Sequence, residues 1–183
     1  MSLENLRFTE LNNSLNLTSF NCDDEDINDF LQNDALKYQT QKLSNTYLFL
    51  DDSNEVVAFF SISNDCLNDL GEERGFNKTA WNRFHRKQNI PNDKRIKQYP
   101  SIKIGRLGVS RSYQGTGLSY QLMNFIKGFS VLDHKPAVRL LILDAYNRER
   151  QINFYIKNGF SFMLDSYVNS KTRLMFYDLL KLL

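Results

Sequence analysis

The sequence predicts a mixed α/β fold in a single domain, and three features of its pattern support this prediction. Two β-rich apolar segments, residues 45–50 and 55–63, flank the polar stretch "DDSN", which is typical of an antiparallel hairpin. Between residues 102 and 145 a strand, a helix and a second strand follow one another, as in a βαβ unit. The segment 160–180 carries two more strand patterns around a short turn. Antiparallel strands followed by a βαβ unit indicate a mixed sheet.

The remaining elements follow from periodicity and end signals. After an acidic run at Asp24, apolar residues at spacings of three and four predict a helix to about Gln41. Another amphipathic helix begins after Gly117, and Asn158-Gly159 ends a third. Residues 64–100 show no clear hydrophobic periodicity, and we interpret them as an insertion that is partly helical. The predicted order is strand 6–11, helix 24–41, strands 45–50 and 55–63, insertion 64–100, strand 102–109, a helix from 117, strand 137–145, helix 148–157 and hairpin 160–180.

Composition excludes several classes of protein. The 183 residues suit one domain, and 42% apolar residues with 23 basic and 21 acidic side chains describe an ordinary globular chain. The first residues lack the pattern of a signal peptide and no run is long enough to span a membrane, so we expect a cytoplasmic protein without a membrane partner. Two cysteines and two histidines are too few for a disulfide framework or a zinc site, so no metal is predicted.

Residues 112–120 read "SYQGTGLSY" and place two of the eight glycines between a predicted strand and a predicted helix. Backbone N–H groups at a helix start point outward and carry partial positive charge, so such a loop can hold a phosphate. Glycine leaves these amides open and accepts positive φ, although a tight turn without a ligand is the alternative. The loop lacks the Lys-Ser/Thr of a P-loop, and Tyr120 replaces the third glycine of a dinucleotide-binding fingerprint.

The segments "RLGVSRSYQGTGLSYQLM" and "FYIKNGF" resemble the GNAT superfamily of N-acetyltransferases, which transfer acetyl from acetyl-coenzyme A to an amine. The resemblance implies a central mixed sheet of about six or seven strands with helices on both faces. In the family loop, Gln/Arg-x-x-Gly-x-Gly/Ala, backbone amides hold the pyrophosphate; both glycines match here, and Ser112 takes the place of the Gln or Arg. Acetyl-CoA is thus the implied co-substrate, and the implied loop ligands are Gln114, Gly115, Thr116, Gly117 and Leu118.

Tyr155 is the predicted catalytic residue. A tyrosine keeps its proton at neutral pH and can give it to a departing thiolate, and Tyr155 matches the tyrosine of the family. The alternative is a core aromatic side chain. By resemblance, the backbone of Leu107, Gly108 and Val109 lies beside the acetyl group, with Gly108 allowing close approach, and Asn147 contacts the pantetheine arm. No general base is assigned, and proton loss through water is possible. His85 and His134 are expected to be surface residues and not an acid or base.

The acceptor is predicted to be a small-molecule or peptide amine. Aminoacyl-tRNA is the alternative, because "FNCDDEDINDFLQNDA", the long insertion and "FYIKNGF" resemble the GNAT toxins of bacterial toxin-antitoxin pairs, which acetylate its amino group. Eight basic residues and one acidic residue lie between Arg74 and Gln98, with Phe76, Trp81 and Phe84 among them. They can follow a phosphate backbone and stack on bases, or they form a solvated helix that packs its aromatic residues on the core. A catalytically silent CoA-binding regulator and a homodimer also stay open. The basic residues are Arg74, Lys78, Arg83, Arg86, Lys87, Lys94, Arg95 and Lys97.

Overall fold

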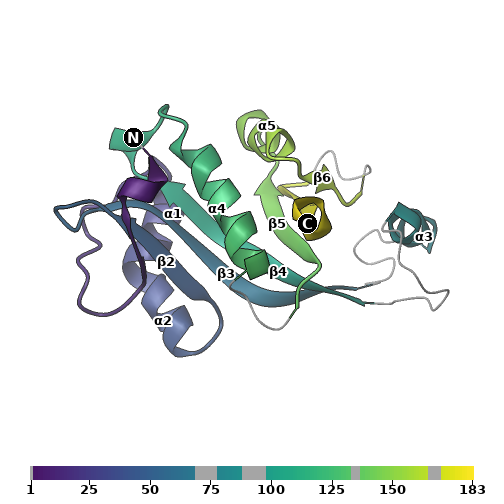
Figure 1. The fold of residues 1–183 in the computed structure, drawn as a ribbon, viewed down its shortest axis with the longest axis horizontal. Helices are drawn as coiled ribbons and strands as arrows, with labels where there is room; N and C mark the ends of the chain where they lie inside the picture. The colour runs from purple at the N-terminus through teal and green to yellow at the C-terminus, as the bar shows by residue number, and fades with distance from the viewer. Residues whose placement is uncertain (1, 69–77, 88–97, 133–136, 165–169) are drawn as a thin grey trace. The chain divides into compact units, whose positions relative to one another are not determined.

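The computed structural model describes residues 2–68, 78–87, 98–132, 137–164 and 170–183 (Figure 1). Its strands form one seven-stranded sheet in the order β1-β2-β3-β4-β5-β7-β6, which confirms the predicted mixed α/β fold. The contacts of the chain group into two compact units, residues 1–64 with 103–129 and residues 65–102 with 130–183.

In the first unit, the predicted hairpin is confirmed. β2 (Asn45–Leu50) and β3 (Val56–Asn68) pair antiparallel, and β1 (Arg7–Glu10) pairs antiparallel with β2. Asn54 turns the chain between β2 and β3 with a φ of 62°, a left-handed conformation that asparagine tolerates better than most residues. A hydrogen bond of 3.1 Å from the backbone N–H of Asp51 to the carbonyl of Glu55 closes the turn.

Helices cover both faces of this part of the sheet (Figure 1). On one face, α1 (Glu25–Asp29), a π-helical turn (Phe30–Asp34) and α2 (Ala35–Thr40) bury Leu31 and Ala35 together with Leu48 of β2 and Phe59 of β3. On the other face, α4 (Leu118–Leu132) packs Phe125 against rings of the sheet. The side chains alternate between the two faces because the period of a strand is two. The rings that contact Phe125 are those of Phe8, Phe49, Phe60 and Phe129.

In the second unit, β5 (Leu140–Tyr146) and β6 (Ser161–Phe162) both pair antiparallel with β7 (Thr172–Asp178). Arg139 and Asp178 form a largely buried, bidentate ion pair where β5 begins and β7 ends, with N–O distances of 2.9 and 3.0 Å. The chain then leaves the sheet: Leu179–Leu182 form a 3-10 turn instead of the predicted continuation of the strand. The Asp178 carboxylate caps this turn by accepting from the Leu180 N–H.

The insertion is partly strand and partly helix. β3 runs to Asn68 and β4 (Gln98–Val109) begins four residues earlier than predicted, while α3 (Lys78–Lys87) lies between them. Trp81 and Phe84 of α3 are 6% and 5% exposed, in a core cluster with Tyr99. Their burial contradicts the interpretation that these two rings stack on bases and confirms the alternative, a basic helix with its aromatic side chains on the core. Phe76 and basic residues 74, 94, 95 and 97 lie outside the described residues.

Candidate active site

The predicted phosphate loop connects β4 to α4 in the first unit. At the end of β4 the Ser110 N–H donates to the carbonyl of Val57 over 2.8 Å, and a 3-10 turn (Arg111–Tyr113) follows. Gly115 and Gly117 then adopt φ values of +77° and +82°. L-residues rarely enter this region, so the sequence places glycine where the backbone requires it.

Five consecutive backbone N–H groups in this loop, those of residues 115–119, donate to no other group in the described part of the chain. They include the first amides of α4, which no helix can satisfy from within, and the first turn of α4 carries no acidic side chain. A Cβ built on Gly115 or Gly117 would meet no protein atom within 4 Å. Open amides, a positive helix end and open space beside the glycines together fit an anion such as a pyrophosphate.

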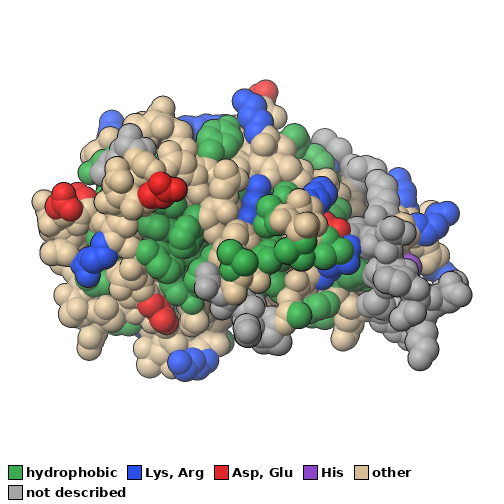
Figure 2. Space-filling view, in the orientation of Figure 1, with side chains coloured by type: hydrophobic (Ala, Val, Ile, Leu, Met, Phe, Trp, Pro, Cys, Tyr) green, Lys and Arg blue, Asp and Glu red, His purple; other side chains and the backbone are tan. Residues whose placement is uncertain are grey.

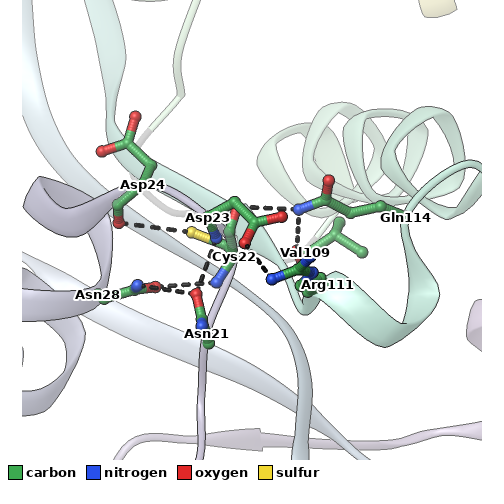
Figure 3. Close-up of polar contacts among 8 residues, drawn as sticks. All are labelled: Asn21, Cys22, Asp23, Asp24, Asn28, Val109, Arg111 and Gln114. Atoms are coloured by element: carbon green, nitrogen blue, oxygen red, sulfur yellow. Dashed lines mark hydrogen bonds and ion pairs between the residues drawn. The ribbon is translucent and has the colours of Figure 1, made fainter.

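Beside the loop lie residues 21–24, which we call the strap (Figure 3). Gln114 donates both hydrogens of its side-chain amide to backbone carbonyls, that of Cys22 at 2.9 Å and that of Val109 at 3.2 Å. The Arg111 N–H donates to the carbonyl of Asn21 over 2.7 Å, and the Arg111 guanidinium pairs with Asp23 at 3.3 Å. The sequence drew attention to this segment only through its resemblance to the GNAT toxins and did not indicate its contact with the loop, although its Asn- and Asp-rich composition is typical of local turns.

Core packing gives Gly108 a reason to be glycine besides the predicted close approach of a ligand. A Cβ at this position would lie 2.9 Å from the ring of Phe59, 3.1 Å from that of Phe20 and 3.2 Å from a methyl group of Ile27. The residue is therefore glycine because the core of the first unit packs against its backbone, and this packing is sufficient without a ligand. Gly108 and Val109 are buried and Leu107 is half-buried.

Tyr155 lies in the second unit, near the end of α5 (Glu149–Lys157). The helix ends as predicted, because Gly159 takes a φ of +81° and the Phe160 N–H donates back to the Tyr155 carbonyl over 3.0 Å. The rings of Phe154 and Phe160 contact the Tyr155 ring edge-on, with centroids at 5.2 and 5.8 Å. Burial raises the pKa of Tyr155 to about 12, so its hydroxyl keeps its proton at neutral pH.

Two other residues that the sequence singled out have structural contacts. The Asn147 side-chain amide, predicted to contact the pantetheine arm, donates to the carbonyl of Ser170 over 3.0 Å, next to β7. His85 was expected at the surface, but it is half-buried and its Nδ1 lies 2.7 Å from the Tyr99 hydroxyl. His134 lies outside the described residues.

The described ranges hold no cluster of three or more His, Cys, Asp or Glu side chains that is placed to bind a metal ion. Both cysteines, Cys22 and Cys66, are unpaired thiols. None of the helices in the described part of the chain combines the length and hydrophobicity that crossing a membrane requires.

Solved structures with this fold include three that match nearly the whole chain. AtaT complexed with acetyl-methionyl-tRNAfMet is 21% identical, with a TM-score of 0.69 over 97% of this chain and 96% of that chain. A mutant AtaT toxin bound to the C-terminus of the antitoxin AtaR and to acetyl-CoA is 19% identical, with a TM-score of 0.66 over 97% and 95%. A mutant of KacT is 22% identical, with a TM-score of 0.70 over 98% and 99%. No model of a protein family matches the sequence. The likeness confirms the predicted GNAT-like fold.

Proposed function

We propose that this protein is an acetyl-CoA-dependent N-acetyltransferase and that its acceptor is the α-amino group of an aminoacyl-tRNA. The first part rests on one observation above all: the row of open amides at residues 115–119, at the start of a long helix and beside two glycines with positive φ. In the same fold, a mutant AtaT is bound to acetyl-CoA. The acceptor rests on the likeness to AtaT complexed with acetyl-methionyl-tRNAfMet, which favours tRNA over the small amine first predicted.

In this proposal the residues divide the work of binding and chemistry. When bound, acetyl-CoA supplies an acetyl group activated as a thioester. The amides of residues 115–119 hold its pyrophosphate, and the backbone at the end of β4, residues 107–109, orients the acetyl group and stabilises negative charge on its carbonyl oxygen. Tyr155 holds a proton on its hydroxyl and gives it to the sulfur as the C–S bond breaks, and water then returns a proton to the tyrosine oxygen. Asn147 orients the pantetheine arm. The amine releases its own proton to water.

The exposed side of α3 offers a surface for the tRNA phosphates. Lys78, Arg83 and Arg86 are exposed, and Figure 2 shows blue Lys and Arg side chains over this helix, at the right of the view. Because Trp81 and Phe84 fix the opposite side of α3 to the core of the second unit, the arginines are carried by an anchored helix. Each phosphate that such a residue neutralises releases condensed counterions, which strengthens binding at low salt.

Acetyl transfer from labelled acetyl-CoA decides between the candidate acceptors. We expect label on aminoacyl-tRNA, lost when mild base hydrolyses the aminoacyl ester, and no label on uncharged tRNA. Label on free amines or on a lysine peptide, with none on aminoacyl-tRNA, would contradict the tRNA proposal and favour the small amine. Tight acetyl-CoA binding without transfer to any of these would favour a silent CoA-binding regulator.

Replacing Tyr155 tests the proposed proton donor. Tyr155→Phe keeps the ring and removes the hydroxyl, so turnover should fall by about 100-fold or more while the Kd for acetyl-CoA stays within about twofold. Tyr38→Phe is the matched control, because Tyr38 is a 45% exposed tyrosine on α2 and should be dispensable. Equal turnover of the two variants would exclude Tyr155 from the chemistry.

A further inference from the structure

The cofactor loop is tied to a segment that lies far from it in the sequence. Gln114 and Cys22 are 92 residues apart, yet the Gln114 amide bridges the Cys22 carbonyl of the strap and the Val109 carbonyl at the end of β4 (Figure 3). Both N–H groups of the Gln114 side chain therefore donate within the protein. A side chain used in this way fixes the first residue of the loop, and it has no N–H left for a ligand.

The strap is itself held firmly. Cys22 is buried, and its backbone N–H donates to the side chain of Asn28 over 2.9 Å. Asn28 in turn donates to the Asn21 side chain over 3.1 Å, and the Asp24 carboxylate caps α1 by accepting from the Ile27 N–H. The strap is thus an extension of the start of α1, whose partly buried Ile27 packs against the core of the first unit.

A second set of bonds joins the strap to the chain just before the loop. The Arg111 N–H donates to Asn21, and the Arg111 guanidinium pairs with Asp23. Asp23 has a φ of +64°, so the strap keeps a left-handed backbone at the residue that faces Arg111. The ion pair is exposed and adds little by itself, whereas the two backbone carbonyls that accept from Arg111 and Gln114 set the position of the loop.

We infer that Gln114 is a positioning residue and that the strap, residues 21–24, keeps the amides of residues 115–119 aimed at one anion. This inference rests on the proposed binding of acetyl-CoA and revises the sequence-based expectation that Gln114 is itself a ligand. Without the strap, the two glycines would let the loop adopt many conformations, and each would have to be lost again when the pyrophosphate binds. The hydrogen bonds from Gln114 and Arg111 to the strap, which we call the clamp, order the loop during folding, so that this entropy is not lost again on binding.

The test compares acetyl-CoA affinity, by calorimetric titration, with thermal stability. Gln114→Met keeps the size of the side chain but removes both donors, and it should weaken acetyl-CoA binding about tenfold and raise KM without lowering kcat at saturation. Gln114→Glu places a carboxylate against two carbonyl oxygens and should weaken binding further. Gln39→Met is the matched control: Gln39 also makes two backbone hydrogen bonds in the first unit, to Leu11 and Thr46, so its loss should lower the Tm but leave acetyl-CoA affinity unchanged.

A second pair of variants tests the strap from its own side. Asp23→Gly and Asp23→Val both lose the ion pair, but only valine strains a backbone at positive φ. Asp23→Val should therefore bind acetyl-CoA several-fold more weakly than Asp23→Gly. If Gln114→Met and Asp23→Val bind acetyl-CoA like the wild type while Gly117→Ala binds it weakly, the loop binds the cofactor but the strap does not position it. If the wild type does not bind acetyl-CoA, both the positioning role of the strap and the proposed function are refuted.

Discussion

Gly117→Ala separates the two reasons for glycine in the loop, backbone conformation and ligand access. Gly117 has a φ of +82°, and alanine at such an angle costs about 1–2 kcal/mol of unfolding free energy. For a chain of this length the loss lowers the Tm by about 2–8 °C. The new methyl group meets no protein atom within 4 Å, so no further loss from a clash is expected in the protein without ligand.

Binding of acetyl-CoA should suffer more than stability does. The methyl group occupies the space beside the open amides, and losing one hydrogen bond to a charged phosphate costs about 1.5–3 kcal/mol, or roughly 10- to 100-fold in Kd. Calorimetric titration measures this loss. Gly128→Ala in α4 serves as a compensating variant, because Gly128 has open space for a Cβ and alanine stabilises a helix interior by about 0.5–1 kcal/mol. The double variant should regain stability but not affinity. Wild-type affinity in a folded Gly117→Ala protein would refute the assignment of the loop.

Three further predictions concern the other parts of the proposal. Replacing Arg83 and Arg86 together with Gln should reduce the slope of log K against log salt for aminoacyl-tRNA binding by about 2, whereas Lys37→Gln, an exposed lysine on α2, should leave it unchanged; equal slopes in all three proteins would exclude α3 from the interface. Trp81→Ala should lower the free energy of unfolding by about 3–5 kcal/mol in chemical denaturation, because the ring is 6% exposed; a small loss together with weakened tRNA binding would instead restore the stacking interpretation. Because burial raises the pKa of Tyr155 to about 12, the folded protein keeps a proton that the unfolded chain releases above about pH 10. Stability should therefore fall by about 2–3 kcal/mol between pH 10 and pH 12 in urea unfolding, and Tyr155→Phe should lack this fall.

The sequence by itself determined most of the elements and the two positions in the loop that require glycine, because both depend on local pattern. The hairpin of β2 and β3 followed from alternation around a polar turn, and the end of α5 followed from Asn158-Gly159, where φ at the glycine is +81°. Gly115 and Gly117 were recognised for the same reason: a position that requires positive φ before a helix is occupied by glycine, which is visible in the sequence itself. The basic character of the insertion was also visible, since charge can be counted without a fold.

The tertiary structure decided which contacts each of these residues makes. The sequence around Trp81 is compatible with both a base-stacking residue and a core residue, and only the packing of α3 on Tyr99 distinguishes the two roles. The backbone of Gly108 packs against the rings of Phe59 and Phe20, which precede it by 49 and 88 positions, and Gln114 contacts the strap across 92 residues. Contacts over such separations leave no periodic signal in one sequence, because they depend on how the chain folds back on itself. The raised pKa of Tyr155 has the same origin, since the atoms that exclude water from its hydroxyl are gathered only when the chain folds.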